Sequence, residues 1–75
     1  MSASDAISVA IPKRVLDQLS GPLGLERLEG RARYELRNMA HARWGAGVQL
    51  EYATVNDYDA SGAVIGLRLV ASKLR

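Results

Sequence analysis

Two stretches of alternating apolar and polar residues on either side of a polar turn constrain the fold of this chain most strongly. The residues expected on the inward face before and after the turn are Val48, Leu50, Tyr52, Thr54, Ala63, Ile65, Leu67 and Leu69. A period of two residues is typical of a half-buried β-strand. Residues 48–71 are therefore predicted to form one β-hairpin with a long tip.

The same alternation predicts how the two strands pair. We expect Leu50 to lie opposite Leu69, because apolar residues then meet on one face of the hairpin. This register places Glu51 opposite Arg68 on the other face, where the two side chains would form a charge pair.

The beginning of the chain predicts a further strand and a short helix. Residues 6–11 alternate in the manner of a strand, and Pro12 suits the first position of a helix because its missing N–H costs nothing there. We expect the helix to cover residues 13–20 and to stop at Gly21.

A longer helix is expected from Leu25 to about His41 or Trp44, after a tight connection over residues 21–24. Its apolar stripe, spaced as in an amphipathic helix, consists of Leu25, Leu28, Ala32, Leu36, Met39 and Ala40. Gly30 is the weak point, since glycine in a helix interior costs up to about 1 kcal/mol relative to alanine. The sequence leaves open whether the helix is continuous there.

The predicted order is strand, helix, helix, strand, strand, which indicates a small α+β fold. We expect a three-stranded sheet, with the hairpin at its C-terminal end and both helices packed on one face. The 75 residues form a single domain, and residues 1–5 are expected to be a poorly ordered leader.

Composition excludes several kinds of site. The chain has no cysteine and one histidine, so disulfides, thiolate zinc sites and histidine-rich metal sites are excluded. No apolar run is long enough to cross a bilayer, and the N-terminus does not resemble a secretory signal. We therefore expect a cytoplasmic protein with no cofactor and no membrane partner. A chain this small often gains stability by self-association, and a homodimer is expected.

The predicted hairpin tip, residues 57–62, resembles the start of an EF-hand calcium loop. Asp57, Asp59 and Ser61 provide oxygen atoms at positions one, three and five, and Gly62 stands at position six. Position twelve, where the family has a bidentate glutamate, is Arg68, and strands rather than helices flank the tip. Because the same residue types are typical of turns, we interpret the tip as a strand reversal without a metal.

One face of the long helix is the candidate binding site. Opposite the apolar stripe lies a set of residues that we call the arginine face: Arg27, Arg31, Tyr34, Arg37, Asn38 and His41. Arginine provides forked donors for carboxylate or phosphate, and tyrosine adds a ring with a polar end. This face could bind an acidic protein surface or a nucleic acid, or it could be a solvated helix face neutralised by neighbouring glutamates.

Residues 7–19, which run from Ile7 through Pro12 to Leu19, resemble the opening of ribbon-helix-helix DNA-binding proteins. The resemblance implies that two such strands pair across a dimer and lie in the major groove. The side chains that would face the bases, those of Ala6, Ser8 and Ala10, offer one hydroxyl group between them. DNA binding is therefore kept as the alternative function.

No pattern of catalytic residues is recognisable. His41 has no serine or cysteine partner in a nucleophile motif, and the glycines at 45 and 47 precede a strand instead of following one. We therefore expect a non-catalytic binding protein that docks a protein partner. Size and an Ala/Arg-rich composition suggest an accessory factor or inhibitor of the phage or mobile-element type.

Overall fold

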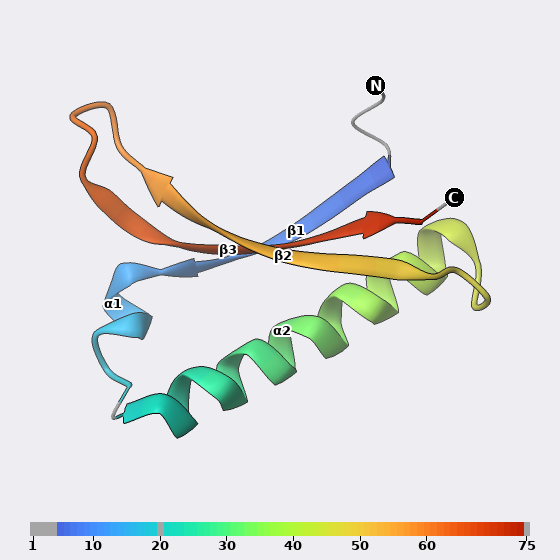
Figure 1. The fold of residues 1–75 in the computed structure, drawn as a ribbon, viewed down its shortest axis with the longest axis horizontal. Helices are drawn as coiled ribbons and strands as arrows, with labels where there is room; N and C mark the ends of the chain where they lie inside the picture. The colour runs from blue at the N-terminus through green and yellow to red at the C-terminus, as the bar shows by residue number, and fades with distance from the viewer. Residues whose placement is uncertain (1–4, 20, 75) are drawn as a thin grey trace.

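A computed structural model describes residues 5–19 and 21–74 of the chain (Figure 1). The elements follow in the order β1 (Ala6–Pro12), α1 (Lys13–Leu16), α2 (Gly21–Trp44), β2 (Leu50–Tyr58) and β3 (Val64–Lys73). This order confirms the predicted α+β class and the sequence strand, helix, helix, strand, strand. No helix in the described part of the chain is long and apolar enough to span a membrane.

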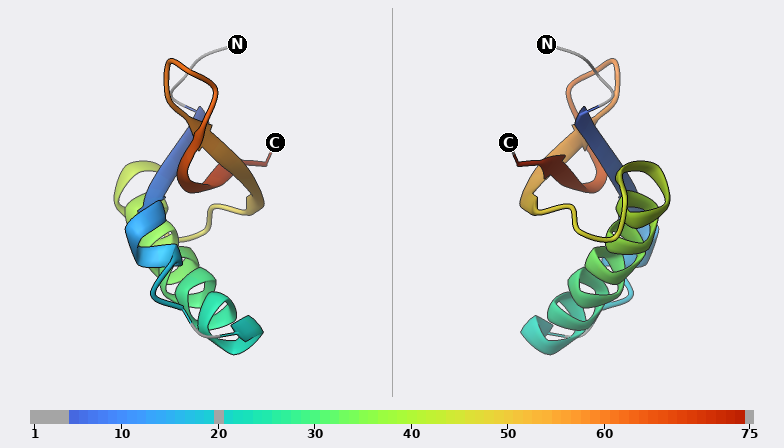
Figure 2. Two further views of the ribbon diagram at one scale, coloured as in Figure 1. Left: turned by 90° about the vertical axis from the view of Figure 1, so that its left-hand side faces the viewer. Right: turned by 90° about the vertical axis from the view of Figure 1, so that its right-hand side faces the viewer.

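The three strands form one antiparallel sheet in the order β1-β3-β2, so the last strand of the chain is central. The long helix α2 crosses below the sheet, and α1 connects the end of β1 to the start of α2 (Figures 1 and 2). Helix α2 packs mainly against β1 and β3 rather than β2. The opposite face of the sheet carries no helix in the described chain.

The buried core lies between α2 and the sheet. It consists of Ala32 and Leu36 from the helix and Leu69 and Ala71 from the central strand. The half-buried side chains of Ile7, Val9, Leu50 and Tyr52 pack around this cluster. The buried positions Ala32, Leu36 and Ala40 follow an i, i+4 spacing, which places them on one stripe of the helix.

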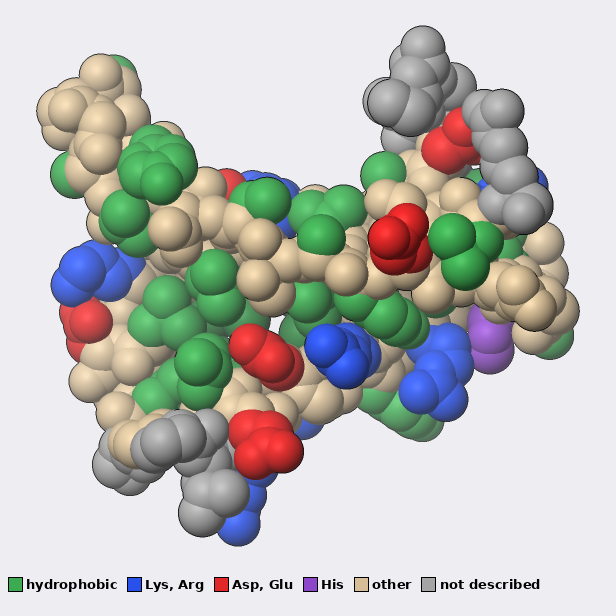
Figure 3. Space-filling view, in the orientation of Figure 1, with side chains coloured by type: hydrophobic (Ala, Val, Ile, Leu, Met, Phe, Trp, Pro, Cys, Tyr) green, Lys and Arg blue, Asp and Glu red, His purple; other side chains and the backbone are tan. Residues whose placement is uncertain are grey.

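Two residues of the predicted apolar stripe are exposed. Leu25 is exposed near the start of α2, and Met39 is 42% exposed. Helix and sheet diverge toward the start of α2 (Figure 1). Figure 3 shows apolar side chains gathered in the resulting gap between the hairpin and the first half of the helix.

The predicted register of the hairpin is wrong by four residues. Leu50 lies opposite Lys73 instead of Leu69, and Arg68 lies opposite Val55 instead of Glu51. β2 extends into the predicted tip as far as Tyr58, β3 begins at Val64, and a register shift lies between Asp57 and Tyr58. Because four is an even number, the side chains of residues 50–57 and 66–73, which precede this shift in the ladder, keep their predicted faces.

The predicted helix boundaries also need correction. Helix α1 ends at Leu16 rather than at residue 20, and the N–H groups of Gln18 and Leu19 then donate to the carbonyls three residues earlier. Residue 20 lies outside the described residues. Helix α2 begins at Gly21, so the predicted connection over 21–24 forms its first turn, where a proline is tolerated. The helix is continuous through Gly30.

Candidate docking surface on helix α2

Most of the arginine face lies on the side of α2 that points away from the sheet, and Arg31 lies at its edge beside β1. Tyr34 is 65% exposed, and Arg27, Arg31, Arg37 and Asn38 are exposed as well. His41, near the C-terminal end of the helix, is partly buried. This exposure follows from the helix repeat, because burial of Ala32, Leu36 and Ala40 against the sheet turns the residues between them outward.

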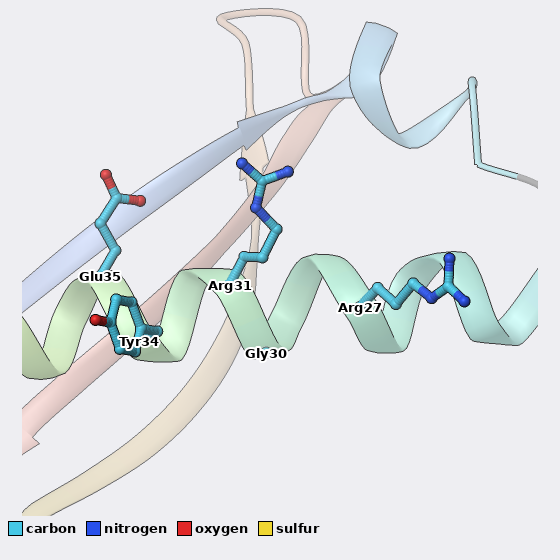
Figure 4. Close-up of a pocket in the computed structure, with 5 residues that line it drawn as sticks. All are labelled: Arg27, Gly30, Arg31, Tyr34 and Glu35. Atoms are coloured by element: carbon cyan, nitrogen blue, oxygen red, sulfur yellow. The ribbon is translucent and has the colours of Figure 1, made fainter.

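Half of the arginine face lines one shallow hollow. The hollow has a volume of about 600 Å³ and is lined by Arg27, Gly30, Arg31, Tyr34 and Glu35 (Figure 4). Gly30 leaves it open, since a β-carbon added there would meet no other atom within 4 Å. We call this site the α2 hollow. It combines an exposed aromatic ring, two guanidinium groups and one carboxylate on a rigid helix.

Gly30 and Glu35 line the α2 hollow although neither belongs to the predicted arginine face. The spacing of residues 27, 30, 31, 34 and 35 is i, i+3, i+4, i+7, i+8, which defines one helix face and could have revealed both. The remaining predicted residues Arg37, Asn38 and His41 do not line the α2 hollow.

In the described chain, Arg27, Arg31 and Arg37 form no ion pair with a neighbouring glutamate. Among the described residues, the ion pairs join Lys13 to Asp17 and Arg68 to Asp57, and none involves Arg27, Arg31 or Arg37. Two other arginines of α2 are occupied differently. Arg33 lies 5.3 Å from the ring centroid of Tyr52, and Arg43 lies 5.5 Å from that of Trp44. Arg27 and Arg31 are therefore free to pair with an external anion.

The hairpin tip has the geometry of a turn held by one carboxylate. Asp59 Oδ1 accepts hydrogen bonds from the Ser61 hydroxyl at 2.6 Å, the Ser61 N–H at 2.8 Å and the Ala63 N–H at 3.0 Å. These donors hold the pKa of Asp59 below its ordinary value of 3.8, with the Ser61 hydroxyl as the largest cause. Asp57 pairs with Arg68, the residue at position twelve of the EF-hand comparison.

These two carboxylates are therefore engaged within the hairpin itself. Residues 5–19 and 21–74 contain no group of three or more histidine and acidic side chains placed to hold a metal ion. The function of the chain has to be argued from the α2 hollow and the sheet. No protein-family model, no curated protein and no solved structure matches this chain.

Proposed function

We propose that this chain is a non-catalytic binding protein that docks a protein partner through the α2 hollow. The observation that carries the proposal is Tyr34, a 65% exposed aromatic residue flanked by two arginines without an ion pair. Tyrosine and arginine dominate the energetics of protein interfaces, because they bury a large area while retaining polar contacts.

The chemistry of the hollow indicates what kind of partner surface fits. An apolar side chain of the partner would occupy the open space above Gly30 and contact the ring of Tyr34. Carboxylates on either side of that apolar group would pair with Arg27 and Arg31, in the bidentate geometry that guanidinium groups favour. Glu35 at the rim would accept from a donor of the partner, so the partner surface is mixed rather than purely acidic.

Nucleic acid is the second candidate, and the unpaired arginines favour it as well. Arg27, Arg31 and Arg37 would contact phosphates and Tyr34 would stack on a base. The carboxylate of Glu35 in the same hollow is repelled by phosphate, which makes this the weaker candidate. In the ribbon-helix-helix alternative β1 would read DNA, whereas in this structure one edge of β1 pairs with β3.

The test is a titration of the isotope-labelled protein, followed through its backbone amide signals. One probe is a pool of peptides with a leucine or tryptophan between aspartates and glutamates, and the other is a short random DNA duplex. Each is added at low and at moderate salt. We expect the peptides to shift signals of residues 27–35 and the affinity to depend weakly on salt.

A matched pair of variants locates the site. Arg27→Ala/Tyr34→Ala is expected to weaken peptide binding at least about tenfold. Arg43→Ala/Tyr58→Ala also removes one arginine and one exposed tyrosine, but away from the hollow, and should leave the affinity unchanged within about twofold. If the protein binds DNA with an affinity that falls steeply with salt, nucleic acid rather than a protein is the partner. Equal losses in both variants would remove the hollow from consideration.

The proposal extends to the setting in which the protein works. We propose a cytoplasmic accessory factor or inhibitor of the phage or mobile-element type, active as a homodimer. A chain of 75 residues with a small core supports self-association, because such a core contributes little stability alone.

A further inference from the structure

The outer edge of β1 is an unprotected strand edge. Order β1-β3-β2 makes both β1 and β2 edge strands in the described chain. β2 carries Glu51 and Asp57, two charges of the kind that discourage pairing at a strand edge, and a register shift lies between its last two residues. β1 has seven residues, AISVAIP, without a charge or an interruption before Pro12. Its free backbone groups can accept another strand.

A groove runs along this edge, between β1 and α2. Its lining includes Val9 and Ile11 from the strand and Leu28, Arg31 and Glu35 from the helix. A strand added to β1 would place its inward side chains over this groove, on the same side of the sheet as the core. Apolar inward side chains are therefore required of the added strand.

The β1 strand of a second copy of this chain meets this requirement. Around Val9, the strand is nearly symmetric: Ile7 corresponds to Ile11, and Ser8 corresponds to Ala10. In an antiparallel pair centred on Val9, isoleucine meets isoleucine on the inner face and serine meets alanine on the outer face. A two-fold interface needs this self-complementarity, because each position meets its symmetry counterpart.

We propose that two copies of this chain pair through β1 about a two-fold axis at Val9, forming a continuous six-stranded antiparallel sheet. This inference builds on the proposed homodimer; it shares Arg31 and Glu35 with the α2 hollow, and its test reads the oligomeric state rather than docking. It fixes the strand order as β2-β3-β1-β1-β3-β2 across the two copies. Both copies of α2 then lie on the same face of the sheet.

The position of α2 allows the two helices to pack side by side. Because α2 packs against β1 and β3, its axis lies about one strand spacing, or about 5 Å, from the two-fold axis. The two helices are then about 10 Å apart, close to the usual 8–10 Å between packed helices. The six-stranded sheet therefore brings the helices into contact without any change in either copy.

The side of α2 that would face the second helix carries opposite charges. Arg31 and Glu35 point from the helix toward β1 (Figure 4) and line the groove beside Val9. Two copies bring two arginines and two glutamates together around the axis, so each guanidinium has a carboxylate of the other copy in reach. Met39 lies one helical turn after Glu35 and is 42% exposed in the single chain. The contact between the two helices would bury this methionine.

Reversing the charges of Arg31 and Glu35 tests the proposal, with the mass of the protein measured by light scattering during size exclusion. The wild-type chain is expected at twice its mass of 8.1 kDa. Arg31→Glu and Glu35→Arg each place four like charges at the axis and are expected to elute as monomers at the same concentration. The control Arg37→Glu reverses a charge on another side of α2 and should remain dimeric.

Mixing the two monomeric variants provides the decisive result. One copy then contributes two glutamates and the other two arginines, so a one-to-one heterodimer is expected. The double exchange Arg31→Glu/Glu35→Arg should likewise restore the homodimer. A monomeric wild type at millimolar concentration, or dimers that ignore the charge reversals, would overturn the proposal. Arg31 and Glu35 also line the α2 hollow, so docking is tested separately with Arg27→Ala/Tyr34→Ala, which leaves both of them in place and should remain dimeric.

The register is tested by cross-linking, for which the absence of native cysteine is convenient. In a pair centred on Val9, residue 8 of one copy lies opposite residue 10 of the other, within the Cα separation that a disulfide bridges. A mixture of Ser8→Cys and Ala10→Cys should oxidise to the heterodimer in preference to either homodimer. Preferential homodimers would contradict the axis at Val9.

Discussion

The guanidinium of Arg68 donates from Nε to Asp57 Oδ1 at 3.1 Å and so joins the central strand to β2. The same side chain donates from Nη1 to Ser8 Oγ of β1 at 2.9 Å. One arginine therefore connects all three strands on the face of the sheet that no helix covers. Arg68 lies opposite Val55 in the ladder, so its carboxylate partner is the residue two positions further along β2.

Removing this connection should reduce stability measurably. Arg68→Met keeps most of the side-chain volume and loses both hydrogen bonds. We expect a loss of about 1 kcal/mol in the free energy of unfolding, a discounted value because the Arg68 and Asp57 side chains are 39% and 26% exposed. Urea denaturation measures it. The control Lys13→Met breaks an exposed i, i+4 pair and should change stability by less than about 0.5 kcal/mol.

Gly66 is required by the close approach of β1. A β-carbon built at this position would lie 2.5 Å from the backbone oxygen of Ile11, which belongs to the neighbouring strand. Gly66→Ala must therefore push β1 away from β3, and we expect a loss of about 1–3 kcal/mol in thermal or urea unfolding. Unchanged stability would show that the two strands are further apart than the structure has them.

Gly30 behaves in the opposite way. Gly30→Ala places a methyl group in open space on a continuous helix, so the free energy of unfolding should rise by up to about 1 kcal/mol. Gly30→Leu also favours the helix but fills the α2 hollow. This variant should keep the melting temperature at or above that of the wild type, and it should weaken the binding of the acidic peptides at least about tenfold. Binding unchanged in the leucine variant would argue against an occupied hollow.

The hairpin tip should respond to acid through Asp59. Its pKa is depressed in the folded chain, so the carboxylate stabilises the turn above pH 3.8 and this contribution is lost as pH falls through the lower folded value. Amide signals of Ser61 and Ala63 should report this loss during an acid titration. Asp59→Ala should abolish the response and loosen the tip at neutral pH, whereas Asp59→Asn keeps an acceptor oxygen and should loosen it less.

The local pattern of apolar and polar residues was sufficient to predict much of this fold. Alternation along β1 and the hairpin identified the three strands and their inward faces, because successive side chains of a strand always point to opposite sides. Exposure of Tyr34 and the arginines around it followed from the helix repeat in the same way. These properties depend on a few neighbouring residues, which are visible in the sequence.

Properties that depend on distant segments were not predictable in this way. Leu50 could pair with Leu69 or with Lys73 without changing its face, and the length of the turn together with the fit of β1 beside β3 selects between them. Gly21 begins α2 with a φ of 76°, a left-handed conformation that glycine adopts readily, so the same residue type suits the start of this helix as well as the end of the one before it. Gly30 and Glu35 joined Tyr34 in one hollow because α2 stays continuous. Periodicity thus determines which side chains face inward, and packing between remote elements determines which of them meet.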